Sequence, residues 1–179
     1  MALILFLTGT PGVGKSTVAR RVAESLKLDG SKVGGMTTGD LISGSARIGF
    51  EIRDLSTDEA GVLAHVNRAT GPRIGKYRVN DEDLDKIGAG AILSAIKDAD
   101  LIIIDEVGPM ELTSMRFKEA VRAALACGKP VLGTVHRNAQ DPLVTGIKST
   151  AGIEVIEVTY RNREDLLGTL VERFKAGRR

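Results

Sequence analysis

Residues 9–16 read Gly-Thr-Pro-Gly-Val-Gly-Lys-Ser, which fits the pattern G-x-x-x-x-G-K-[ST] at every fixed position. The glycines let the backbone curl so that successive N–H groups point at a phosphate. Lys15 brings a positive charge to the β and γ phosphates, and the Ser16 hydroxyl is suited to ligate Mg²⁺. An apolar run over residues 3–7 precedes the motif, as a buried strand should, and an amphipathic helical pattern follows it over residues 18–26. We therefore expect the helix N-terminus to face the phosphates of a bound nucleoside triphosphate.

Composition and charge limit the class of protein. The chain has 179 residues, of which 42% are hydrophobic and 27% charged, an ordinary balance for a globular protein. This length suits a single core, so we expect residues 1–179 to form one domain. The formal charge of +2 gives no indication of nucleic-acid binding, and we interpret the basic end, Lys175 to Arg179, as a solvated tail.

The sequence gives no indication of a membrane or of an oxidising compartment. No apolar stretch approaches the roughly 20 residues of a bilayer span. The apolar N-terminus has no basic region before it and runs into the phosphate loop, which favours a strand over a signal peptide. Cys127 is the single cysteine, so no internal disulfide is expected. We expect a cytoplasmic protein without membrane partners; the sequence does not define the oligomeric state, and a monomer is compatible with it.

Apolar periodicity predicts strands and helices in alternation. Residues 47–53 alternate with period two, and a short turn at residues 43–45 separates them from a strand expected over residues 32–38, so these two strands should form an antiparallel hairpin. The apolar run over residues 101–104 is typical of a central parallel strand covered on both faces. The predicted fold class is α/β: a three-layer P-loop domain whose mainly parallel sheet carries an antiparallel hairpin insertion around residues 31–66. Further strands are expected at 3–7, 61–66, 131–135 and 153–158, and helices after residue 16 and from Asn80, Thr113, Asp141 and Asn162.

A second motif follows the expected central strand, where Asp105 and Glu106 come directly after the apolar run. A carboxylate at the tip of such a strand lies beside the phosphate loop, so Asp105 is expected to hold Mg²⁺ through water. Glu106 is a candidate to polarise the attacking water, and the alternative is a loop cap or a salt bridge to a surface lysine. Glu111 is a further carboxylate nearby, for which a structural role after the turn at Gly108-Pro109 is at least as well supported.

Two other groups of polar residues follow strands. Thr134 or His136 is placed to sense the γ-phosphate and Arg137 to act as an arginine finger in cis, against the alternative of an ordinary strand-to-loop transition. Arg161 and Arg163 follow the last strand, where a base would stack on a guanidinium, although a helix start at Asn162 also explains this segment. Lys76 and Tyr77 are candidates to border the same site.

Several of these motifs together carry a family resemblance. They are residues 9–17, Arg47-Ile-Gly-Phe50, Gly75-Lys-Tyr77, Ile104-Asp-Glu-Val-Gly-Pro-Met-Glu-Leu112, Gly133-Thr-Val-His136 and Asn162-Arg163. With them the chain resembles, over nearly its whole length, the THEP-type nucleoside-triphosphatases, relatives of the cancer-related nucleoside-triphosphatase. The resemblance implies a RecA-like sheet and slow, Mg²⁺-dependent hydrolysis of several nucleoside triphosphates with a loose base preference. It also implies that residues 102–109 contact the nucleotide.

The leading hypothesis is therefore a nucleoside-triphosphate phosphatase, a hydrolase acting on acid anhydrides. Lys15 and Glu106 are its catalytic candidates, Ser16 and Asp105 its Mg²⁺ candidates. Two alternatives stay open: a P-loop kinase whose acceptor binds at residues 31–79, and a nucleotide-dependent switch. The residues expected to contact the nucleotide are Gly9, Thr10, Pro11, Gly12, Val13, Gly14, Lys15, Ser16, Thr17, Ile102, Ile103, Ile104, Asp105, Glu106, Val107, Gly108 and Pro109.

Overall fold

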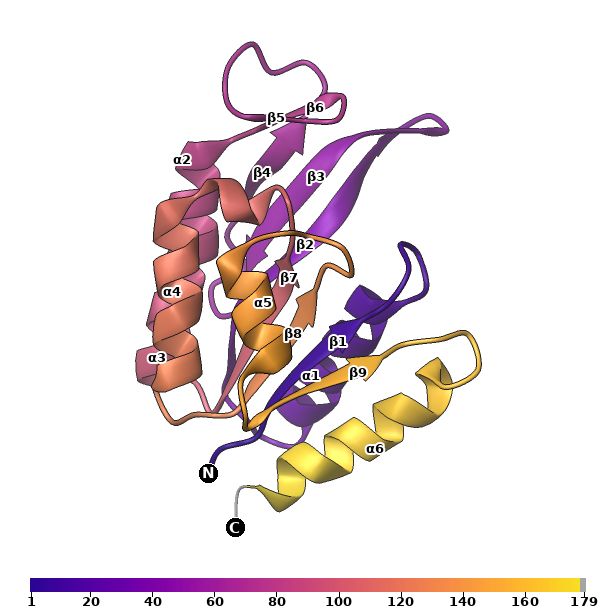
Figure 1. Cartoon of the computed structure of the whole chain (residues 1–179), viewed down its shortest axis with the longest axis vertical. Helices are drawn as coiled ribbons and strands as arrows, with labels where there is room; N and C mark the ends of the chain where they lie inside the picture. The colour runs from indigo at the N-terminus through magenta and orange to yellow at the C-terminus, as the bar shows by residue number, and fades with distance from the viewer. Residues whose placement is uncertain (178–179) are drawn as a thin grey trace.

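The structure, a computed structural model, describes residues 1–177, which form one nine-stranded sheet with helices on both faces (Figure 1). The order of the strands in the sheet is β5-β6-β4-β3-β2-β7-β8-β1-β9. The strands are β1 (Ile4–Thr8), β2 (Val33–Ser43), β3 (Ala46–Asp54), β4 (Ala60–His65), β5 (Arg73–Ile74), β6 (Tyr77–Val79), β7 (Leu101–Val107), β8 (Val131–Val135) and β9 (Ile153–Glu157). The helices are α1 (Lys15–Leu28), α2 (Asp81–Asp83), the π-helix η1 (Leu84–Ala89), α3 (Gly90–Asp98), the short 3₁₀-helix η2 (Glu111–Thr113), α4 (Met115–Ala126), α5 (Pro142–Ser149) and α6 (Arg163–Ala176).

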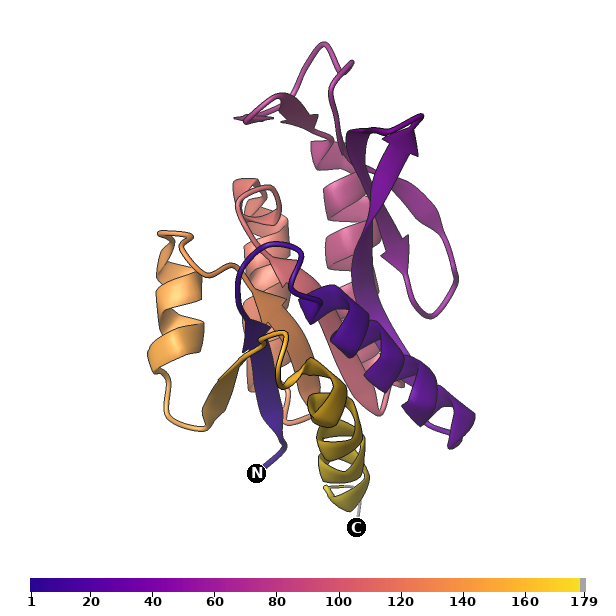
Figure 2. The same ribbon diagram turned by 90° about the vertical axis from the view of Figure 1, so that its right-hand side faces the viewer.

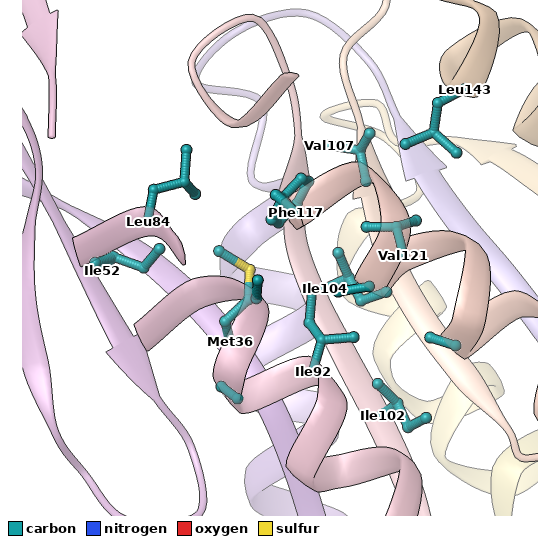
Figure 3. Packing of buried hydrophobic residues seen from close by; sticks show 14 of the residues in the cluster. Met36, Ile52, Leu84, Ile92, Ile102, Ile104, Val107, Phe117, Val121 and Leu143 are labelled. Atoms are coloured by element: carbon teal, nitrogen blue, oxygen red, sulfur yellow. The ribbon is translucent and has the colours of Figure 1, made fainter. Parts of the chain in front are cut away.

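The half of the sheet from β2 to β9 is parallel and forms the middle of three layers. Alternate residues of β7 enter different cores: Ile102 and Ile104 pack under α3, α4 and α5, whereas Leu101 and Ile103 pack under α1 and α6. Figure 2 shows α1 and α6 lying together on their face of the sheet, and Figure 3 shows Ile102 and Ile104 among the side chains of the opposite core. An all-apolar strand is therefore required here, and the predicted three-layer class is confirmed.

The strand order also places β8 between β1, which leads into the phosphate loop, and β7, which carries Asp105 near its carboxyl end. This is the RecA-like order that the family resemblance implies. All three strands are parallel, so their carboxyl ends meet at one edge of the sheet. Ligands of open α/β sheets bind outside this edge, and the motif residues gather there.

The other half of the sheet is antiparallel and is larger than the sequence predicted. β2 and β3 form the expected hairpin around Gly44, but the antiparallel pairing continues through β4 and β6 to Val79, beyond the expected end near residue 66. The β5–β6 hairpin was not predicted, because two strands of two and three residues are too short to show a period. In Figure 1 this half extends above the phosphate loop.

Two predicted helix starts need correction. α4 is capped by Ser114 rather than Thr113: the Ser114 hydroxyl accepts a hydrogen bond from the Phe117 N–H at 2.9 Å, while Thr113 belongs to η2. Asn162 does precede α6, but its side-chain oxygen accepts from the Thr159 N–H at 2.8 Å and so holds the loop instead of capping the helix. Among the described residues no helix has the length and apolar character needed to cross a membrane.

Candidate active site

The phosphate loop joins β1 to the start of α1. Gly14 precedes the helix with φ of 112°, a backbone conformation that side chains disfavour, and no side chain caps the first N–H groups. Val13 is only 2% exposed and anchors the loop in the core beneath α1. The Lys15 ammonium donates to the carbonyl oxygens of Gly9 at 3.1 Å and Thr10 at 3.4 Å. The free N–H groups and the lysine thus form a preformed anion site at a helix N-terminus.

Asp105 connects the phosphate loop to the two central strands. Its Oδ1 accepts hydrogen bonds from the Ser16 hydroxyl at 2.8 Å and from the Thr134 hydroxyl at 2.6 Å. The carboxyl group is 2% exposed, and this burial raises its pKa to about 6, although both hydrogen bonds act in the opposite direction. Residues from β7, β8 and α1 are therefore held together at one carboxylate oxygen.

The Ser16–Asp105 pair fits Mg²⁺. The described residues include no group of three or more His, Cys, Asp or Glu side chains that could hold a metal ion as a complete protein cage. Mg²⁺ does not need one, because it keeps several waters and takes one or two protein oxygens together with substrate phosphates. A hydroxyl and a carboxylate 2.8 Å apart beside the phosphate loop offer that donor set.

Two further carboxyl groups flank Gly108: Glu106 comes from the end of β7 and Glu111 from η2. A Cβ placed on Gly108 would stand 2.7 Å from Oε1 of Glu106 and 3.1 Å from Oε2 of Glu111, so a larger residue there would displace these carboxyl groups. Burial raises the pKa of Glu106, and the Lys15 charge opposes the shift. Glu111 is 4% exposed; burial first, and the Glu106 charge second, raise its pKa to about 8. The sequence did not decide between a catalytic and a structural role for Glu111. Its one indication was that Glu111 lies close to Asp105 and Glu106 along the chain.

The three candidates at the end of β8 have different positions. Thr134 is completely buried, donates a hydrogen bond to Asp105 and is not among the residues that line the cleft. His136 lines the cleft, and burial lowers its pKa, with Lys15 adding to the effect. Arg137 also lines the cleft and pairs with Glu157, with 3.4 Å between the charged atoms.

The cleft in front of the phosphate loop measures about 1130 Å³. One side, which we call the phosphate wall, consists of the loop with Asp105, Glu106, Glu111 and His136. The facing side, the hairpin wall, consists of residues 37–40 of β2 with Arg47, Phe50, Glu51 and Arg53 of β3.

The hairpin wall joins two motifs that are far apart in the sequence. The Arg47 guanidinium lies 4.9 Å from the centre of the Phe50 ring, and that ring meets Tyr77 edge-on with 5.1 Å between centres. The Arg47 Nε also donates to the Tyr77 hydroxyl at 3.3 Å. The Arg-Ile-Gly-Phe and Gly-Lys-Tyr motifs therefore build one stack.

The residues predicted to contact the base lie in different parts of the structure. Arg163 donates to the Val13 carbonyl oxygen at 3.4 Å and lies 5.1 Å from the centre of the Tyr160 ring, beside the phosphate loop. Arg161 is exposed on the loop before α6. Lys76 lies over Tyr77 between β5 and β6, at the opposite edge of the sheet from β9, so Lys76 and Tyr77 do not border the site of Arg163.

Some residues of the stretch 102–109 do not present side chains to the cleft. Their burial follows from the strand, because alternate β7 side chains fill the two cores. Within residues 102–109 the cleft is lined by Asp105, Glu106 and Pro109, and contact of this stretch with a nucleotide stays a prediction. The fully buried residues are Ile102, Ile103, Ile104 and Val107.

The chain is similar to a family model, to several known proteins and to two solved structures. A family model described as NTPase matches residues 4–171. Proteins described as nucleoside-triphosphatase THEP1 include one from Methanosarcina barkeri, 47% identical with 97% of this chain and 98% of the relative covered, and one from Thermotoga maritima, 36% identical with 97% of each covered. The crystal structure of THEP1 from the hyperthermophile Aquifex aeolicus superposes with a TM-score of 0.85 at 28% identity, covering 96% of this chain and 98% of that one. The solution structure of a human cancer-related nucleoside triphosphatase gives 0.82 at 33% identity, covering 99% of this chain and 100% of that one.

Proposed function

We propose a specific reaction for this chain, which belongs to the NTPase family and is a nucleoside-triphosphatase. In this reaction the protein slowly hydrolyses ATP, GTP and other nucleoside triphosphates to the diphosphate and phosphate with Mg²⁺. The observation that carries the proposal is the contact of Ser16 and Thr134 with one oxygen of Asp105, beside Glu106 and the phosphate loop. The cytoplasmic location expected from the sequence is part of the same proposal.

The phosphate wall binds and orients the triphosphate. The backbone N–H groups of the loop and of the first turn of α1 would hold the β and γ phosphates, and Lys15 would exchange its hydrogen bonds with Gly9 and Thr10 for phosphate oxygens. Ser16 and Asp105 would hold Mg²⁺, which when bound neutralises charge on the β and γ phosphate oxygens. Because Asp105 is already fixed by two hydroxyls, little reorganisation is needed when the nucleotide binds.

Glu106 would act on the attacking water. The water oxygen forms a bond to the γ-phosphorus, the bond from that phosphorus to the bridging oxygen breaks, and the water proton passes to the Glu106 carboxylate. Burial raises the pKa of Glu106, which makes its carboxylate a stronger base than an exposed glutamate. A loose base preference is consistent with the Arg163–Tyr160 stack, because a guanidinium stacks on purines and pyrimidines alike.

The test is phosphate release from ATP, GTP, CTP and UTP with Mg²⁺ by the parent, Glu106→Gln and, as a control, Glu24→Gln. Glu24 lines the same cleft from α1, but its carboxylate is exposed and pairs with Arg20. We expect release from all four substrates by the parent and the control. Glu106→Gln should bind ATP with parental affinity and lose about 10²-fold or more of kcat.

Two results would oppose the proposal. Release by Glu106→Gln at the parental rate would remove Glu106 from the chemistry. ATP bound without release in any protein would leave the kinase or the switch, neither of which the comparisons favour.

A further inference from the structure

His136 is a residue of the phosphate wall to which the proposed reaction gives no task, and three hydrogen bonds hold it in place. Its backbone N–H donates to the Val107 carbonyl oxygen at 3.0 Å, and its own carbonyl oxygen accepts from the Lys148 ammonium at 3.1 Å. Its ring Nδ1 accepts from the Asn138 N–H at 3.2 Å. Both the backbone and the ring of His136 are therefore fixed before a substrate binds.

The bond to Asn138 decides which ring nitrogen of His136 carries a hydrogen. A backbone N–H can only donate, so Nδ1 accepts and carries none. Burial, and after it the charges of Lys15 and Lys148, lower the pKa of His136, so the ring is uncharged at neutral pH. The one hydrogen of the neutral ring then lies on Nε2, which takes part in no hydrogen bond among residues 1–177. His136 thus offers an N–H donor to the cleft that it lines.

The strand order places this donor between the phosphate loop and the pair Asp105 and Glu106. β8 lies between β1, which leads into the loop, and β7, which carries the pair. His136 directly follows the last residue of β8 and lines the cleft together with Lys15 and Glu106. After burial, the Lys15 charge is the largest influence on the pKa of both His136 and Glu106, so the ammonium lies near both groups. A γ-phosphate held by Lys15 beside Glu106 therefore has His136 next to it.

Two comparisons within the chain show what is particular to His136. Arg137, the next residue, is held by Glu157 through a pair whose side chains are 48% and 53% exposed, so its charge is already engaged. The turn formed by a histidine Nδ1 is by itself no sign of function, because His65 accepts from the Asn67 N–H at 3.0 Å and does not line the cleft. The position of the ring on the phosphate wall distinguishes His136.

We propose that the Nε2–H of His136 donates a hydrogen bond to a γ-phosphate oxygen, and that this bond is stronger in the transition state of hydrolysis than in the bound substrate. His136 is then a catalytic residue that keeps its proton: it stabilises charge on the phosphoryl oxygens, while Glu106 takes the proton of the attacking water. The inference rests on the proposed function, since it adds a donor to that reaction. A donor that is fixed in advance needs no reorganisation, and loss of one lowers kcat by about 10²–10³-fold.

Two substitutions separate the donor from the turn. In His136→Gln the amide nitrogen reaches the place of Nε2, but the acceptor for the Asn138 N–H is lost. In His136→Asn the amide oxygen takes the place of Nδ1 and keeps that acceptor, but no atom reaches the place of Nε2. At pH 7.5 we expect His136→Gln to retain about tenfold more of kcat for ATP than His136→Asn, with similar KM values. The same two substitutions at His65 are the control, and both should keep kcat within about threefold of the parental value.

A second measurement uses the parent itself. The chain has two histidines, so ¹⁵N NMR of the imidazole rings of the untagged protein gives two sets of signals, which the His65 variants assign. Spectra are compared between complexes with Mg²⁺ and ADP and with Mg²⁺ and the β,γ-imido analogue of ATP, which carries a γ-phosphate. We expect the Nε2–H tautomer of His136 in both complexes and a downfield shift of its Nε2 proton only with the analogue. The signals of His65 should not change.

The outcomes separate the inference from the proposed function. A kcat of His136→Asn equal to or above that of His136→Gln would overturn the role of His136, and so would His136 signals that are the same in the two complexes. In either case hydrolysis by the parent would still support the proposed function. No hydrolysis by the parent would overturn both. If the His136 variants unfold, the NMR comparison alone decides.

Discussion

The phosphate wall is held by hydrogen bonds between buried groups, whereas the hairpin wall is held by ion pairs whose side chains are open to solvent. Asp105 and Thr134 are 2% and 0% exposed, and the Thr134 hydroxyl oxygen lies 2.6 Å from Oδ1 of Asp105. On the facing wall, Arg47 and Asp40 lie 3.4 Å apart with side chains 48% and 52% exposed. Exposed pairs of this kind contribute little to stability, whereas a buried polar group that loses its partner costs much more. We therefore expect the phosphate wall to be the more rigid of the two, and the exposed side-chain pairs of the hairpin wall to rearrange at lower cost.

The difference also indicates where the chemistry is concentrated. Preorganised groups stabilise a transition state because they need not move during the reaction. The raised pKa values of Asp105, Glu106 and Glu111 are all on the phosphate wall. We expect changes on the phosphate wall to alter the rate of hydrolysis strongly and changes on the hairpin wall to alter it weakly.

The largest effect is expected when Lys15 is replaced by alanine. Loss of the charge beside the β and γ phosphates should lower kcat/KM for ATP by about 10³-fold. Lys27→Ala is the matched control, since Lys27 lies on the same helix and lines the same cleft but donates to the Leu55 carbonyl oxygen at 2.8 Å. We expect its kcat/KM to stay within about threefold of the parental value. Similar losses in both variants would show that the cleft responds to its total charge and not to a defined phosphate site.

The second prediction concerns stability and pH. The pKa values of Asp105 and Glu111 are about 6 and about 8 in the folded protein, above the values of roughly 4 expected for the unfolded chain. The unfolded state therefore releases these protons first. The stability that the two groups contribute is complete below about pH 4 and is lost as the pH rises through 6 and then 8.

Urea unfolding at pH 5 and pH 8.5 measures this loss. Between these pH values the free energy of unfolding of the parent should fall by on the order of 3 kcal/mol more than that of Glu111→Gln, because glutamine does not titrate. Equal losses in the two proteins would mean that Glu111 is ionised in the folded state, and the contrast between the two walls would then rest on Asp105 alone.

The third prediction compares two threonines at the ends of neighbouring strands. Thr134→Val removes the hydroxyl that donates to Asp105, which should raise the pKa of Asp105 further and lower kcat by about tenfold to thirtyfold. The Thr8 hydroxyl is buried without a partner among the described residues, so Thr8→Val should leave kcat unchanged and raise the stability by about 1 kcal/mol. Steady-state kinetics and urea unfolding decide. A loss of kcat in Thr8→Val like that in Thr134→Val would show that valine at the strand ends disturbs the loop itself.

The two walls were predictable from the sequence to different extents. The phosphate loop, Asp105 and Glu106 are adjacent to strands whose apolar runs are easily recognised, so their meeting at one edge follows from parallel order. The contact of Arg47 with Tyr77 depends on antiparallel pairing through β4 and on the short β5–β6 hairpin, and neither register is encoded locally. Glu111 was recognisable as an acid near the site, but its burial depends on η2 and α4, which only the fold reveals.

The smallest effect is expected for Arg47→Ala on the hairpin wall. The change removes the contact over Phe50 and the exposed pair with Asp40, so the stability should fall by about 0.5–1 kcal/mol. Phosphate release from ATP should remain within about threefold of the parental rate, because no group on the phosphate wall loses a partner. Arg73→Ala is the control: Arg73 is an exposed arginine of β5 that donates to the Gly75 carbonyl oxygen at 3.0 Å outside the cleft. A tenfold loss of kcat in Arg47→Ala but not in Arg73→Ala would mean that the hairpin wall closes onto the substrate during turnover, and the division between a reactive wall and a passive one would fail.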